Sequence, residues 1–169
     1  MTPSVGDVGD VGETSVPAES EGAVLLFFLS RLRNSVVRAA EGLTDEQQRE
    51  PGVQSGTSLL GLIQHLAGVE EHWFQRVFLG EDHVIDQSMD VPATTAPDEV
   101  VAAYRQAWAR SDEIVRACPD LSTLAAIANP GEARRASLRR IVAHMIEETG
   151  RHAGHADILR EQIDGTTDL

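Results

Sequence analysis

Glu148 and His152 are the residues of this chain whose types and spacing point most directly to chemistry. They stand four positions apart in a stretch, residues 137–164, whose apolar side chains recur at helical spacing. Projected at about 100° per residue, both fall inside the apolar arc of that predicted helix. The arc comprises Leu138, Ile141, Met145, Leu159 and Ile163. A buried carboxylate is costly unless it is paired or bound to a metal, and side chains at i and i+4 can reach one ion.

A third ligand is available from a second predicted helix, residues 58–80. Its apolar arc comprises Leu59, Leu62, Ile63, Leu66, Val69, Trp73 and Val77. His65 lies on the flank of this arc, and imidazole with carboxylate is a common ligand set for divalent metals. We therefore predict a metal site formed by His65, Glu148 and His152. Glu70 lies near the middle of the arc, so it is a second buried carboxylate, with an arginine or a ligand imidazole as its expected partner.

Each of these residues also has a structural alternative. A lone histidine on a helix flank is usually a packing residue, and a Glu and a His four positions apart usually form a solvated pair. His144 and His155, on the flank of the 137–164 arc, are expected to be structural or to orient a ligand. His83 lies in an acidic stretch that is typical of a solvated loop.

The elements that must position these residues are all helical. Apolar spacing, serine and threonine caps, glycines and prolines predict helices over about 18–40, 58–80, 97–118 and 137–164, with one further turn at 44–47. No alternating stretch predicts a strand. We expect an all-α fold, an antiparallel four-helix bundle over residues 19–165, after a disordered N-terminal tail over residues 1–18. The connections 81–97 and 118–136 are long for a minimal bundle and are expected to cover a site.

Composition excludes several classes of partner. The chain has 169 residues and a net charge of −13, and such an acidic surface repels nucleic acid and anionic membranes. No stretch reaches the roughly 20 apolar residues of a membrane span. Cys118 is the only cysteine, so no intramolecular disulfide is possible. We expect a cytoplasmic protein that acts on a small molecule.

Two segments resemble a known family. Residues 57–73, which include Gln64-His65-Leu66, are similar to the second helix of DinB-like proteins, and residues 144–161, which include Glu148 and His152, are similar to their fourth helix. The resemblance covers roughly residues 20–165 and is closest to an actinobacterial branch.

The resemblance implies a bundle with one divalent metal ion, often zinc or nickel, held by a histidine of the second helix and a His-x-x-x-His pair of the fourth. Glu148 stands where the first histidine of that pair is usual. The metal-binding domain of mycothiol-dependent maleylpyruvate isomerase is similar in using Glu-x-x-x-His. His155 or Glu70 would then be a fourth ligand or a residue that orients the ligands.

For function, the resemblance implies a metal-dependent thiol S-transferase with mycothiol as cofactor, or a related isomerase or hydrolase. One alternative is a non-catalytic, metal- or ligand-binding stress-response bundle. Another is a helical dimerisation domain without a metal. A homodimer is compatible with each of these functions.

Overall fold

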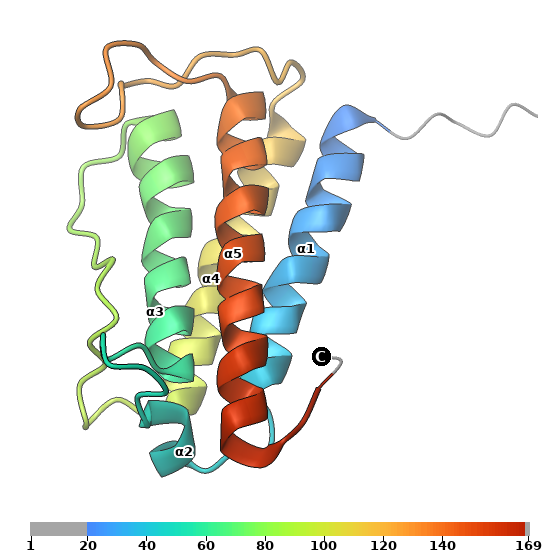
Figure 1. Cartoon of the computed structure of the whole chain (residues 1–169). Helices are drawn as coiled ribbons and strands as arrows, with labels where there is room; N and C mark the ends of the chain where they lie inside the picture. The colour runs from blue at the N-terminus through green and yellow to red at the C-terminus, as the bar shows by residue number, and fades with distance from the viewer. Residues whose placement is uncertain (1–19, 168–169) are drawn as a thin grey trace, which may run out of the picture.

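Four long helices pack into a bundle in the computed structural model, which describes residues 20–167 (Figure 1). They are α1 (Glu21–Ala40), α3 (Leu59–Glu70) continued by η1 (Glu71–Leu79), α4 (Pro97–Ala117) and α5 (Leu138–Asp164), and the one-turn helix α2 (Asp45–Arg49) lies at one end. No strand occurs within residues 20–167. The predicted all-helical bundle is confirmed, and the predicted tail lies outside the described residues. No helix in the described part of the chain is long and apolar enough to cross a membrane.

Serines and glycines set the ends of these helices as the sequence predicts. The side chains of Ser20, Ser58 and Ser137 each accept a hydrogen bond from the amide three residues later, which satisfies a free N–H of the first turn. Gly80 and Gly165 end η1 and α5 with φ angles of 77° and 79°, a left-handed conformation that favours glycine. The first helix therefore begins at Glu21, after its serine cap, and not near Ala18.

The order of helix directions differs from a simple up-and-down bundle. Glu21 pairs with Arg139 where α1 and α5 begin, and Arg160 donates to the carbonyls of Ala39 and Glu41 near where both end. Helices α1 and α5 are therefore parallel. The connection after η1 returns along α3 before α4 begins, so α3 and α4 are also parallel (Figure 1). The α1/α5 pair runs antiparallel to the α3/α4 pair, so the predicted antiparallel packing is found between the two pairs and not within them.

The helix that carries His65 changes its hydrogen bonding after Glu70. From Glu71 to Leu79 it is a π-helix, in which each N–H bonds the carbonyl five residues back. The sequence predicted one regular helix over this range. Because residues 71–79 form a π-helix instead, the projection at about 100° per residue does not apply beyond Glu70. The π-helix η1 ends against the 118–137 connection, where two amides of that connection donate to the carbonyls of Val77 and Phe78.

The bundle core consists of three clusters of buried apolar side chains, and the metal-binding candidates lie at its edge. Side chains from α1, α3, η1 and α5 are fully buried in it, among them Leu29, Ile63, Phe74, Ile141 and Met145. Such close-packed interiors hold their backbones rigid. Helices α3 and α5 therefore present the side chains between them in a fixed register.

Candidate metal centre

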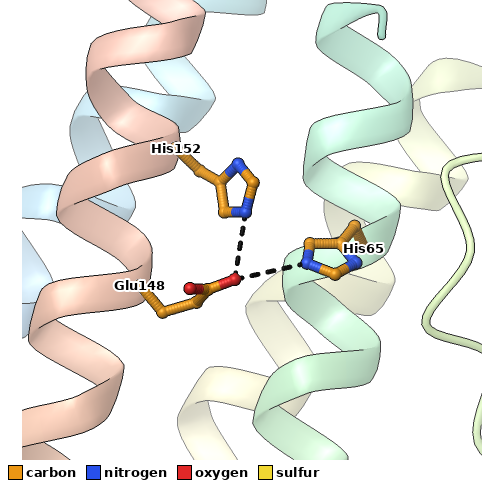
Figure 2. Close-up of side chains that lie close together, drawn as sticks. All are labelled: His65, Glu148 and His152. Atoms are coloured by element: carbon orange, nitrogen blue, oxygen red, sulfur yellow. Dashed lines mark hydrogen bonds and ion pairs between the residues drawn. The ribbon is translucent and has the colours of Figure 1, made fainter. Parts of the chain in front are cut away.

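His65 of α3 points toward Glu148 and His152 of α5, and all three meet between the two helices (Figure 2). One potential ligand atom from each residue lies within 4.8 Å of the others. Glu148 Oε1 lies 3.1 Å from His152 Nε2 and 3.5 Å from His65 Nε2. The structure thus brings together the three residues that the sequence singled out. Antiparallel packing of α3 against α5 is what allows residues 83 positions apart to converge.

A main-chain carbonyl determines where His65 carries its proton. Nδ1 of His65 lies 2.7 Å from the carbonyl oxygen of Gln87, in the connection after η1. A carbonyl only accepts, so Nδ1 is the protonated nitrogen. With Nδ1 protonated, Nε2 of His65 carries a lone pair in the neutral imidazole, and in the imidazolium it carries a second proton that it can donate to Glu148. Metal-ligating histidines are commonly oriented by this kind of bond from the other ring nitrogen.

Glu148 is held as a carboxylate. Its side chain is 14% exposed, and Oε2 accepts a hydrogen bond of 3.0 Å from Arg151. Burial favours the neutral acid, but His152, His65 and Arg151 outweigh burial, so the pKa of Glu148 is lowered from its usual value. Oxygen Oε1, which faces both histidines, is therefore charged at neutral pH.

His152 is held as a neutral imidazole. Burial lowers the pKa of His152 from its usual value, although Glu148 acts in the opposite direction. Its Nδ1 lies 3.4 Å from Nδ1 of His155, on the side of the ring away from Glu148. His155 thus contacts a candidate ligand from outside the cluster. That is the place of a residue that orients His152, the second of the two roles considered for His155.

The donor set fits a divalent cation. The lone pair of His65 Nε2 and the carboxylate oxygen of Glu148 repel one another at 3.5 Å unless a cation or a second proton on His65 compensates them. Two imidazole nitrogens and one carboxylate oxygen are ligands that zinc and nickel accept. Three protein ligands also leave at least one coordination position open.

Glu70 belongs to a different site. Both of its oxygens accept hydrogen bonds from Arg33 of α1, at 2.6 and 2.8 Å. Of the two partners considered for Glu70, the structure has the arginine, and the role of ligand or ligand-orienting residue is not supported. Arg33 also donates to Asp112 of α4 at 2.8 Å, which completes a buried charge network. The network joins three helices in the bundle interior.

Two hollows flank the cluster along α5. One, of about 490 Å³, is lined by Trp73, Glu132, Arg140, Ile141, Ala143, His144 and Glu147. Trp73 and His144 stack edge to face in it, with ring centroids 4.8 Å apart. The other, of about 320 Å³, is lined by Val53, Ser55, Thr57, His155, Ile158 and Leu159. His144 and His155 lie about one helical turn, or 5.4 Å, beyond opposite ends of the Glu148–His152 pair.

Sequence reasoning missed two contributors. The Gln87 carbonyl is a main-chain group, and no side-chain pattern marks it. Arg33 did carry a signal, because it stands in the apolar spacing of α1 between Leu29 and Val36. A charged residue inside an apolar arc requires a buried partner of opposite sign, and Glu70 was available.

Comparison with known proteins identifies the family to which this chain belongs. Residues 24–165, well over half of the chain, match the family model described as mycothiol-S-transferase. No curated protein matches the chain. The matched range includes all three members of the cluster, and the predicted resemblance to DinB-like proteins is confirmed. The chain belongs to the mycothiol-S-transferase family.

Proposed function

We propose that this protein is a divalent-metal-dependent S-transferase that uses mycothiol, with His65, Glu148 and His152 as the metal ligands. The observation that carries the proposal is the convergence of one potential ligand atom each from His65, Glu148 and His152 within 4.8 Å, in a chain of the mycothiol-S-transferase family.

The residues of the cluster have separate tasks in this proposal. His65 and His152 supply neutral nitrogens, and Glu148 supplies one negative charge. Arg151 and the Gln87 carbonyl hold Glu148 and His65 in place. A divalent cation bound there supplies the charge that keeps a thiol in its nucleophilic thiolate form at neutral pH. Three protein ligands, and not four, suit catalysis because an open position remains.

The proposed reaction joins the thiol sulfur to an electrophilic carbon of an acceptor. The thiol gives up its proton, the sulfur–carbon bond forms, and the bond from that carbon to its leaving group breaks. The leaving group takes the electron pair of the broken bond and, in the end, the proton.

The two hollows suit two substrates of different polarity. The hollow at Trp73 and His144 presents aromatic rings and charged groups, which fit a hydrophilic thiol. The hollow at Ile158 and Val53 presents apolar side chains that are 55% and 45% exposed, which fit an apolar acceptor. We assign the thiol to the first and the acceptor to the second, on either side of the cluster.

The first experiment is elemental analysis of the untagged protein and of three variants. We expect about one divalent ion per chain in the wild type and its loss in His65→Ala and His152→Ala. His83→Ala is the control, because it removes a histidine that lies outside the cluster and outside both hollows, and it should keep the ion. Loss of mycothiol transfer to an electrophile in the two ligand variants alone would support the enzyme. A wild-type protein that neither contains nor binds zinc or nickel would refute the proposal.

A further inference from the structure

We propose that Gly61 and Gly68 are positioning residues for the metal centre. They allow the strap, defined as residues 86–90 of the connection after η1, to lie directly on α3, so that the Gln87 carbonyl keeps the His65 proton on Nδ1. The inference rests on the proposed function in that His65 is taken as a metal ligand. Its structural part concerns the protein without metal and is tested separately.

The strap approaches α3 at two glycines where no side chain would fit. A Cβ atom added to Gly68 would lie 2.0 Å from the carbonyl oxygen of Asp86 and 3.1 Å from Cα of Gln87. A Cβ atom added to Gly61 would lie 2.6 Å from the carbonyl oxygen of Met89. These obstacles are backbone atoms, which cannot rotate aside as a flexible side chain can. Any larger residue at either position must therefore move the strap outward.

Hydrogen bonds fix the strap between the two glycines. Gln64 Nε2 donates to the carbonyl of Asp90 at 2.8 Å, one residue before His65 makes its bond to Gln87. Within the strap, the Asp86 carboxylate accepts from the amide of Ser88 at 2.8 Å. The carbonyls at 87 and 90 thus face consecutive side chains of α3. His65 is bonded to the part of the strap that lies between the two points of close approach.

Displacement of the strap would change the chemistry of His65. With Gln87 removed from reach, the ring can carry its proton on Nε2 and donate it to Glu148. In that tautomer Nε2 has no lone pair for a cation. The glycines therefore act through the strap on His65, and they favour the tautomer that can bind a metal.

The substitution Gly68→Ala tests this inference, and Gly154→Ala on α5 is its matched control. An added Cβ at Gly154 meets no atom within 4 Å, and alanine favours helix at both positions, so only contact with the strap distinguishes the two variants. Long-range proton–nitrogen NMR of the histidine side chains in the metal-free protein reports the tautomer of His65. Zinc affinity is measured by competition with a chelator.

We expect the proton on Nδ1 of His65 in the wild type and in Gly154→Ala, and a shift toward Nε2 in Gly68→Ala. Zinc should dissociate from Gly68→Ala with a constant raised roughly 10–100-fold, the usual effect of losing a residue that orients a ligand. Gly61→Ala, whose clash lies at Met89, should shift both readouts in the same direction and serves if Gly68→Ala does not fold.

The outcomes separate this inference from the proposed function. A wild-type spectrum with the His65 proton on Nε2 overturns the inference without any variant. Unchanged tautomer and zinc affinity in a folded glycine variant overturn it as well. A wild type that has the expected tautomer and strap dependence but binds no divalent metal instead refutes the proposed function and leaves the strap as the determinant of the tautomer.

Discussion

Arg33 of α1 and Glu70 of α3 form a bidentate ion pair in which neither side chain has any exposed surface. Asp112 accepts a further hydrogen bond from Arg33 and another from Arg116, whose side chain is exposed, so the charge network extends to the surface. The pair joins α1 to α3 across the bundle interior. This pairing also excludes Glu70 from the metal cluster, although Glu70, like Glu148, lies in a helical segment next to apolar residues.

Substitution of Glu70 by alanine should destabilise the protein without emptying the metal site. Removal of one partner of a buried pair costs about 3–5 kcal/mol of the free energy of unfolding, and Asp112 would remain as the partner of the buried Arg33. Urea unfolding of the metal-free protein measures this loss, and elemental analysis should still find one ion per folded chain. Loss of the ion from a folded Glu70→Ala protein would instead return Glu70 to the ligand set.

Metal binding should raise the melting temperature of the wild type. Zinc at about 100 times its dissociation constant stabilises the folded state by about 2.7 kcal/mol, which corresponds to a shift of roughly 5–10 °C in a domain of this size. Thermal unfolding with and without zinc measures the shift. His65→Ala should show none, whereas His83→Ala, in the connection outside the cluster, should behave like the wild type. An equal shift in His65→Ala would mean that zinc binds elsewhere.

Tyr104 should make the protein sensitive to alkaline pH. It is fully buried, and its hydroxyl has no hydrogen-bond partner among the described residues. Burial and the nearby Glu70 charge raise its pKa well above 10.0, although Arg33 acts in the opposite direction. Because the folded-state pKa exceeds the unfolded one, the contribution to stability is complete below pH 10 and is lost as pH rises above it.

Tyrosinate absorbance follows this titration cleanly, because Tyr104 is the only tyrosine of the chain. We expect no tyrosinate signal from the folded protein near pH 10, and its appearance only together with unfolding. Tyr104→Phe should reduce the alkaline loss of stability while it changes the free energy of unfolding at neutral pH by less than about 1 kcal/mol. Ionisation of Tyr104 near pH 10 in the folded protein would contradict its burial.

The apolar hollow should govern acceptor choice. Ile158→Ser removes most of an apolar wall, so kcat/KM for apolar acceptors should fall about 10-fold while metal content stays unchanged. Steady-state kinetics with an apolar and a small polar acceptor measure the difference, and the polar one should be little affected. Leu124→Ser is the control, because Leu124 is equally exposed, at 53% against 55%, but lines neither hollow. Equal losses for both acceptors would show that the hollow is not the acceptor site.

The helices were predictable because their signals are local. Serine caps, terminal glycines and apolar spacing act within a few residues, so helix ends such as those at Ser58, Gly80 and Ser137 agree with the sequence-based expectation. The π-helical stretch from Glu71 was not predicted, since the same apolar spacing suits a regular helix. Its end is capped by amides of the distant 118–137 connection, which no local pattern reports.

The sequence by itself indicated which side chains could meet an ion, because periodicity places Glu148 and His152 inside one apolar arc and His65 on the flank of another. Tertiary structure decided the rest. The parallel pairing of α3 with α4 sends the chain back along α3, and only that return brings the Gln87 carbonyl to His65. Likewise, Glu70 has Arg33 as its partner because α1 packs beside α3. Such contacts depend on where whole helices lie, and short-range spacing carries no information about that.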